Sequence, residues 1–186
     1  MAQTIAKELL VQSEQEMHAL GAKLAQGLRA GDVVFLMGEM GMGKSVLARA
    51  IARAFGVQGA MPSHSFTILQ SYEAALPVKH FDLYRLEDPA EFYEAGLDEE
   101  MDEKSLSLVE WPEMADFRPE PRLEVRIKRG AQEDSRVLQI DAFGMEDGRA
   151  NALCELLAHC PQAGLISDRQ WEEYRETERN TSVSGT

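Results

Sequence analysis

The sequence has few basic residues for its size. Of 186 residues, 19 are Lys or Arg and 32 are Asp or Glu, which gives a formal net charge of −13. Proteins whose main task is to grip nucleic acid carry a basic surface for the phosphates, so this balance argues against that class. It favours solubility and partners that are basic, or polyanions that are held through a metal ion. We therefore expect no stable binding of nucleic acid by this chain alone.

Cysteines and long apolar runs are also scarce. The two cysteines, Cys154 and Cys160, have neither a C-x-x-C spacing nor a histidine at ligand distance, which indicates buried or idle thiols in a reducing cytosol. No apolar run approaches the roughly 18 residues that a membrane-spanning helix needs. The first residues, MAQTIAKELLVQSEQEM, lack the basic start and apolar centre of a signal peptide. These absences predict a cytoplasmic protein that does not associate with membranes.

Apolar periodicity predicts an alternation of helices and strands. A helix is expected over 13–29, where Ser13 and Glu16 form a capping box. The continuous apolar run Val33–Met37 is typical of a buried parallel strand. Pro89 fits the first helical position of a short helix, because its φ is already fixed there. Further helices are expected over 46–55, 89–97 and 146–159, and further strands over 66–73, 78–85, 105–110, 123–128 and 136–143.

The order of these elements predicts the fold class. Residues 66–73 and 78–85 are joined by the short link AALP, which indicates an antiparallel hairpin in which His80 packs or forms a hydrogen bond. The whole is α/β: a P-loop NTPase-like fold with a central, mainly parallel sheet, this hairpin and flanking helices. No repeat or long linker divides the chain, so we expect one domain over 1–165. A charged and then polar extension, a marginal helix with a frayed tail, is expected over 166–186.

The stretch GEMGMGKS, at the join between an apolar strand and an amphipathic helix, has the phosphate-binding P-loop pattern. Glycines at 38, 41 and 43 allow backbone angles that a Cβ forbids, so successive N–H groups can converge on one anion. The N-terminus of the following helix favours negative charge at the same point. Lys44 would bridge the β- and γ-phosphates, and the Ser45 hydroxyl would bind Mg²⁺. The loop therefore predicts a nucleotide site.

Two acidic residues are candidates for the rest of the site. Glu110 ends the buried strand in LSLVEWP, where ligands gather in such sheets, and would be the second group that holds the metal. The alternative is a glutamate at a sheet edge that faces water. Asp82, in HFDLYR, lies between apolar neighbours, and its side chain could equally alternate to a solvated face.

At this point the sequence resembles the TsaE family (also called YjeE), small bacterial ATPases that assist the synthesis of threonylcarbamoyladenosine (t6A) in transfer RNA. The resemblance is collinear over about residues 13–143, through SEQEMHALGAKLA, GDVVFLMGEMGMGKS, SFTILQSY, HFDLYRLEDPAEFYEAGLDE and LVEWPE. HFDLYR followed by LVEWP is far more specific than the P-loop alone. The resemblance implies a P-loop ATPase that uses ATP and Mg²⁺ and drives turnover of a TsaB–TsaD heterodimer, in which TsaD makes the modification.

The resemblance also implies roles for individual residues. Ser45 and Glu110 would hold the metal, while Lys44 and Asp82 would act in hydrolysis, Asp82 as a catalytic acid or by orienting water. Trp111 would lie beside the nucleotide. The implied nucleotide-binding residues are Gly38, Glu39, Met40, Gly41, Met42, Gly43, Lys44, Ser45, Val46 and Trp111.

The chain departs from the family pattern at two places. The family usually has Ser-Pro-Thr in a switch-like loop before the hairpin, and this chain has Ser63, His64 and Ser65, followed by Thr67. Ser65 keeps a hydroxyl for metal or γ-phosphate, whereas His64 loses the fixed φ of proline. Met17 stands where the family often has a threonine near the adenine.

Two clusters of charge allow more than one interpretation. Nine acids and no bases lie between Arg85 and Lys104, which indicates a solvated face or a docking surface for a basic partner. Arginines and lysines alternate with apolar residues over 123–128, which is typical of the wet face of an edge strand, with transfer RNA contact as the lesser alternative. The basic cluster comprises Arg118, Arg122, Arg126, Lys128, Arg129 and Arg136.

Two other functions remain possible on the same P-loop. A small-molecule or nucleoside kinase would need arginines that close over the transferred phosphoryl group, and the stretch between the first core helix and LVEWP contains only Arg85. A nucleotide-bound interaction protein would have negligible turnover of its own.

Overall fold

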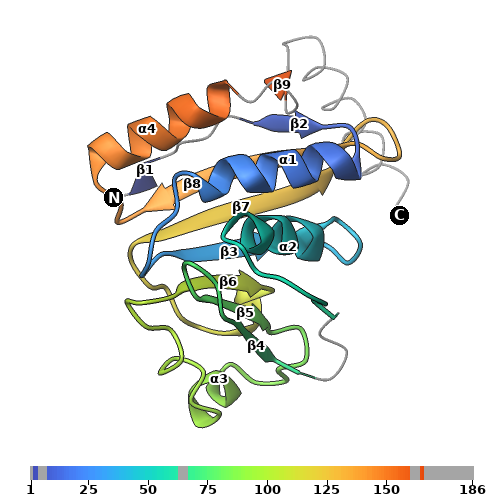
Figure 1. Ribbon diagram of the computed structural model, residues 1–186. Helices are drawn as coiled ribbons and strands as arrows, with labels where there is room; N and C mark the ends of the chain where they lie inside the picture. Colours follow the sequence, from blue (N-terminus) through green and yellow to red (C-terminus); the bar gives the residue numbers. More distant parts are fainter. Residues whose placement is uncertain (1, 4–7, 63–66, 160–163, 166–186) are drawn as a thin grey trace.

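The computed structural model describes residues 2–3, 8–62, 67–159 and 164–165. Its strands form one mixed sheet in the order β4-β5-β6-β3-β7-β8-β2-β9, with β1 paired to β8 (Figure 1). In chain order the strands are β1 (Ala2–Gln3), β2 (Leu9–Val11), β3 (Val33–Met37), β4 (Leu69–Tyr72), β5 (Val78–Asp82), β6 (Leu106–Glu110), β7 (Arg122–Arg129), β8 (Arg136–Phe143) and β9 (Gly164–Leu165).

The parallel part of the sheet is its centre. β5, β6, β3 and β7 run parallel to one another, while β4 on one flank and β8, β2 and β9 on the other are antiparallel to their neighbours. This arrangement confirms the predicted α/β class and the β4–β5 hairpin. It also brings the carboxyl ends of β3, β5 and β6 to one edge, where the glycine turn begins.

The helices are α1 (Glu14–Ala25), α2 (Lys44–Ala54), α3 (Ala90–Glu94) and α4 (Asp147–Ala158), with a 3₁₀ turn η1 (Pro112–Met114). The predicted cap of α1 is present, since Ser13 Oγ accepts from the backbone N–H of Glu16 at 3.2 Å. α1 ends at Ala25, earlier than the predicted 29, and Pro89 occupies the N-cap of α3 rather than its first turn.

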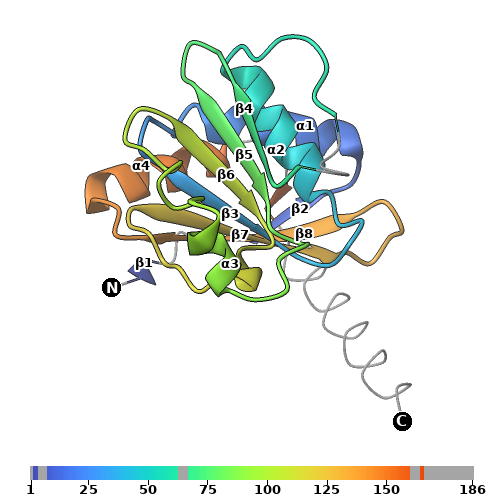
Figure 2. The same cartoon turned by 90° about the horizontal axis from the view of Figure 1, so that it is seen from below.

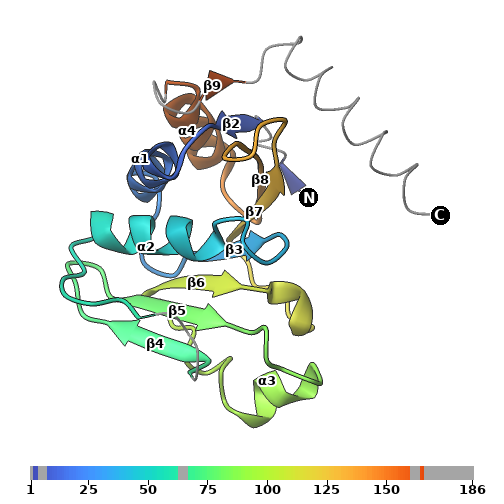
Figure 3. The ribbon, with the colours of Figure 1, turned by 90° about the vertical axis from the view of Figure 1, so that its right-hand side faces the viewer.

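Both faces of the central strands are covered. Val34 and Leu36 of β3 belong to the core beneath α1, α2 and α4, whereas Val33 and Phe35 belong to a second core with Phe92 of α3. Figures 2 and 3 show α1 and α2 on one side of the sheet and α3 on the other. Burial on both faces explains why β3 has a continuous apolar sequence instead of an alternating one.

β7 is not the predicted edge strand. It lies between β3 and β8, and Arg122 and Glu124 on its second face are buried. Arg122 Nε donates to Glu124 Oε1 at 3.0 Å, Arg126 also pairs with Glu124, and Arg126 Nη1 donates to Asp141 Oδ2 at 2.5 Å. At Glu124 and Arg126 the alternation therefore reflects an internal ion-pair network, which sequence periodicity cannot distinguish from a solvated face, whereas Lys128 is exposed.

Several predictions lie outside the described residues. These are the loop residues Ser63 to Ser65, Cys160, and the extension over 166–186, so the division at residue 165 stays a prediction. The acidic residues of 87–103 are exposed apart from the half-buried Glu91, and Lys79 of β5 pairs with Glu100 and Asp102. In the part of the chain that the structure describes, no helix combines the length and apolarity needed to cross a bilayer.

Candidate nucleotide-binding site

The glycine turn joins β3 to α2 through three left-handed glycines. Gly38, Gly41 and Gly43 have φ of 142°, 80° and 100°. A Cβ at Gly38 would lie 2.4 Å from the backbone oxygen of Ile127 on β7, so that position also needs glycine for space. Gly43 is the N-cap of α2 and offers no side chain to cap the helix. The first N–H groups of α2 are therefore available to an anion.

Lys44 is buried at the base of this turn. Its Nζ donates to the backbone oxygens of Gly38 at 2.5 Å and Glu39 at 2.8 Å, and lies 3.8 Å from the ring centroid of Trp111. Burial lowers the pKa of Lys44, against the opposing effect of nearby carboxylates, of which Glu110 is the strongest. The ammonium is thus held inside the turn by carbonyls and an aromatic face.

Ser45, Glu110 and His80 form a chain of hydrogen bonds across three elements. Ser45 Oγ of α2 donates to Glu110 Oε2 at 2.8 Å, and His80 Nε2 of β5 lies 2.9 Å from Glu110 Oε1. Glu110 is 2% exposed, so the alternative of a water-facing edge glutamate is wrong. His80, which was expected to pack or form a hydrogen bond, does both: it is buried in β5, and its hydrogen-bond partner Glu110 lies on the adjacent strand β6.

Asp82, Tyr84 and Trp111 form the other wall of the site. Asp82 is opposite Glu110 in the β5–β6 register, is half-buried, and accepts from the backbone N–H of Tyr84 at 3.1 Å. The Tyr84 and Trp111 rings lie 5.0 Å apart between centroids. Together with the turn these residues enclose a pocket of about 320 Å³, lined by Met40, Gly41, Gly43, Lys44, Ser45, Val46, Asp82, Tyr84, Glu110 and Trp111.

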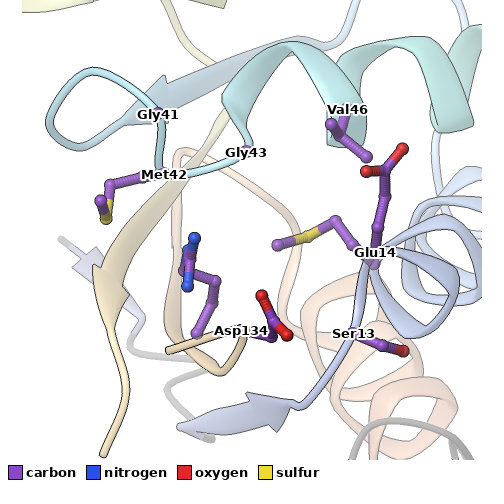
Figure 4. Close-up of a pocket in the computed structure, with 9 residues that line it drawn as sticks. Ser13, Glu14, Gly41, Met42, Gly43, Val46 and Asp134 are labelled. Carbon is purple, nitrogen blue, oxygen red and sulfur yellow. The ribbon is translucent and has the colours of Figure 1, made fainter. Parts of the chain in front are cut away.

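A second pocket, of about 370 Å³, lies on the other side of the turn (Figure 4). Its walls come from the turn, the start of α1 and the loop between β7 and β8. Figure 4 shows the Asp134 carboxylate pointing into the space between the turn and α1. The two pockets share Gly41, Gly43 and Val46 as lining residues, so both adjoin the turn. The second pocket is lined by Ser13, Glu14, Met17, Gly41, Met42, Gly43, Val46, Asp134 and Arg136.

Most of the residues predicted for the site do come together. Met42 lines the second pocket only, while Gly38 and Glu39 line neither pocket and instead offer their carbonyls to Lys44. Thr67 lines neither pocket and accepts from Gln70 Nε2 at 3.2 Å. Sequence reasoning missed the roles of His80 and Tyr84 and the second-pocket residues Ser13, Glu14, Asp134 and Arg136. No local pattern places the β7–β8 loop beside the turn, because that proximity depends on the order of strands in the sheet.

A parallel sheet, a glycine turn that opens a helix, and a buried lysine with a serine and a glutamate beside it define a P-loop nucleotide-binding protein. The comparisons with known proteins make this more specific. The family model for the Threonylcarbamoyl adenosine biosynthesis protein TsaE matches residues 11–138, and the chain belongs to the TsaE family.

Individual relatives agree with this assignment. The tRNA threonylcarbamoyladenosine biosynthesis protein TsaE of Bacillus subtilis is 35% identical over 146 residues, which cover 77% of this chain and 89% of the relative. The protein of the same name from Rickettsia conorii is 34% identical over 152 residues, covering 80% and 86% respectively. The crystal structure of YdiB from Bacillus subtilis is similar with a TM-score of 0.65 and 30% identity, covering 86% of this chain and 97% of that structure.

Proposed function

We propose that this protein is a cytoplasmic, Mg²⁺-dependent ATPase that supports t6A modification of transfer RNA by acting on a TsaB–TsaD pair. The observation that carries the proposal is the convergence of the glycine turn, Lys44, Ser45 and Glu110 on one pocket. The names of the TsaE relatives supply the pathway.

The turn and Lys44 would bind the phosphates. Backbone N–H groups of the turn and the first turn of α2 supply donors for a polyanion, and a net charge of −13 makes such a local positive site necessary. The Lys44 ammonium would exchange its contacts with the Gly38 and Glu39 carbonyls for phosphate oxygens. Charge-assisted bonds of this kind strengthen as negative charge develops at the γ-phosphate.

The residues at the pocket suit a magnesium ion. The Ser45 hydroxyl and the Glu110 carboxylate are the hard oxygen donors that Mg²⁺ prefers, and they lie 2.8 Å apart. No group of three or more His, Cys, Asp or Glu that could hold a metal occurs within residues 8–62 and 67–159. We therefore infer that these two residues hold Mg²⁺ only together with phosphate oxygens, where the ion would neutralise phosphate charge.

Asp82 would orient the attacking water. Its carboxylate lines the same pocket as Lys44, and its contact with the Tyr84 N–H fixes it at the wall. A carboxylate in this position accepts a hydrogen bond from water and directs its oxygen toward the γ-phosphorus. In this scheme Lys44 stabilises the transferred phosphoryl group and Asp82 acts on the nucleophile.

The second pocket would receive the ribose and base. It adjoins the phosphate pocket at Gly43 and Val46, and the buried Met17 and Met42 give it an apolar wall. The Asp134 and Glu14 carboxylates at its rim are acceptors for ribose hydroxyls or a base amino group. Met17 lacks the hydroxyl of the threonine that the family often has at this position, so one polar contact to the base or ribose would be absent.

The first test is binding. Calorimetry of Mg-ATP with the full chain should show association, and Lys44→Ala should weaken it by about tenfold or more, since a hydrogen bond to a charged group contributes about 1.5–3 kcal/mol. Lys104→Ala, at an exposed position, is the matched control. A folded wild-type protein that takes up no Mg-ATP would refute the proposal.

The second test separates hydrolysis from binding and from kinase activity. Asp82→Asn should keep Mg-ATP affinity and lower phosphate release by about 10²- to 10⁴-fold, the usual contribution of a positioned acid or base. Addition of TsaB and TsaD should accelerate phosphate release by the wild type. Phosphorylated product from a nucleoside panel would instead favour the kinase, and a lack of acceleration would favour a nucleotide-bound interaction protein.

A further inference from the structure

His80 holds the carboxylate that the proposed site needs, from outside the pocket. His80 and Glu110 are each 2% exposed, and His80 is not among the residues that line either pocket. An ionised carboxylate only accepts hydrogen bonds, so the His80 Nε2–H is the donor to Glu110 Oε1. The second oxygen, Oε2, accepts from Ser45. Each oxygen of Glu110 therefore has a different, fixed partner.

The sheet register explains how His80 reaches Glu110. His80 is opposite Leu108, and Asp82 is opposite Glu110. Side chains two residues apart on a strand point to the same face, so His80 lies one pleat below Asp82, on the face that α2 covers. Glu110 extends one oxygen back toward His80 and the other toward Ser45 at the start of α2. The histidine thus fixes the rotation of the carboxylate about its own bond.

We propose that His80 is a positioning residue for Mg²⁺, and that it holds the Glu110 carboxylate with one oxygen directed toward Ser45 and the proposed phosphate pocket. The inference rests on the proposed function, because it assumes that Ser45 and Glu110 hold the ion. A partner that donates to one carboxylate oxygen leaves the other oriented as a ligand. Without the donor, the buried carboxylate can rotate away from Ser45, and the arrangement that would hold the ion is lost.

A residue that only orients a metal ligand should affect the Mg²⁺ dependence of ATP binding and leave metal-free ATP binding unchanged. Nucleotide affinity in EDTA depends on the turn and on Lys44, so it should not respond to His80. Loss of His80 should instead raise the Mg²⁺ concentration that gives half of the metal-dependent gain in ATP affinity. Loss of a partner that orients a metal ligand typically lowers metal affinity about 10- to 100-fold.

The test is a titration of Mg²⁺ against nucleotide affinity, measured by calorimetry on the full chain with ATP. His80→Leu should leave ATP affinity in EDTA at the wild-type value and raise the half-saturating Mg²⁺ concentration about 10- to 100-fold. His80→Gln, whose amide can donate from nearly the position of Nε2, should recover most of the loss. His159→Leu, an exposed histidine at the end of α4, is the matched control. Thermal unfolding of each variant measures any structural loss separately.

A second variant tests the same inference with a smaller change in the core. If His80→Leu does not fold, His80→Asn keeps a polar side chain that is too short to reach Glu110 and should give the same Mg²⁺ signature. In a Glu110→Gln background, loss of His80 should no longer change the Mg²⁺ dependence. Folded variants whose Mg²⁺ dependence matches the wild type, or whose affinity falls equally with and without Mg²⁺, overturn the inference. A wild type that binds no ATP in either condition refutes the proposed function instead.

Discussion

Gly21 allows α1 to approach α2 closely, and its replacement by alanine should destabilise the protein. A Cβ at Gly21 would lie 2.5 Å from Ala50 Cβ and 3.2 Å from both Ala50 C and Ile51 N. These atoms belong to α2, which begins at the glycine turn, and two of them are backbone atoms that cannot rotate away. The two helices must therefore move apart to accept one methyl group.

Two effects of opposite sign determine the magnitude. Alanine is favoured over glycine in a helix interior by about 1 kcal/mol. Insertion of a methyl group into a closely packed contact costs about 1–3 kcal/mol. Because the clash at Gly21 involves backbone, we place the packing cost at the upper end and expect a net loss of about 1–2 kcal/mol. For a chain of this length, each kcal/mol lowers the Tm by about 2–4 °C.

Gly148 provides the matched control. It lies in the first turn of α4, is exposed, and has no atom within 4 Å of the position that a Cβ would take. Gly148→Ala should therefore stabilise the protein by up to about 1 kcal/mol. Thermal and urea unfolding followed by circular dichroism would compare the two variants. If both substitutions shift stability in the same direction, the close approach of α1 and α2 is not a constraint and the reasoning fails.

Three further predictions concern other parts of the structure. Arg149→Met should destabilise the fold by about 3–5 kcal/mol in urea unfolding, because it leaves the buried Asp32 carboxylate without its bidentate partner. In a Trp171→Phe background, Mg-ATP should change the fluorescence of Trp111, whose ring contacts Lys44 Nζ; an unchanged spectrum at saturating nucleotide would contradict that contact in solution. The pKa of Asp102 is lowered chiefly by a hydrogen bond from the Lys104 N–H, so the stabilisation it provides is present above the unfolded-state pKa of about 3.9 and is lost as the pH falls through the lower folded-state value. Asp102→Asn should therefore reduce the acid sensitivity of the Tm below pH of about 4.

The sequence was sufficient where local chemistry decides the structure. The apolar run of β3 and the glycine turn after it were predicted to the residue, because a buried strand and a left-handed turn each restrict which residues fit. Glu110 was predicted as a neighbour of the site from its place at a strand end, whereas the role expected of Asp82 came from the family resemblance. The proximity of Glu110 and Asp82 follows from the parallel pairing of β5 and β6, which the structure shows.

The sequence was insufficient where strand order decides the structure. Ile127 on β7 touches Gly38, and Asp134 and Arg136 line the second pocket, because β7 pairs with β3 across the sheet. No local pattern records that pairing, so the strand over 123–128 was predicted at an edge. The strand β2, of three residues, was missed because so short a segment shows no periodicity of its own.

The conformation of Trp111 explains how two consecutive residues of LVEWP both line the pocket beside Lys44. In an extended strand, neighbouring side chains point to opposite faces, so Glu110 on the α2 side would place residue 111 on the other side. Trp111 instead has φ of 57° and ψ of 47°, the left-handed region, which is costly for a bulky residue and is restricted further by the proline that follows. This turn of the chain brings the indole face to 3.8 Å from Lys44 Nζ, while the ring also packs against the second core. Strain of about 1–3 kcal/mol at such a residue persists only where its surroundings fix the conformation. Here the strained residue directly follows Glu110, so one short segment fixes both the aromatic face against Lys44 and the end of the strand that carries the proposed metal ligand.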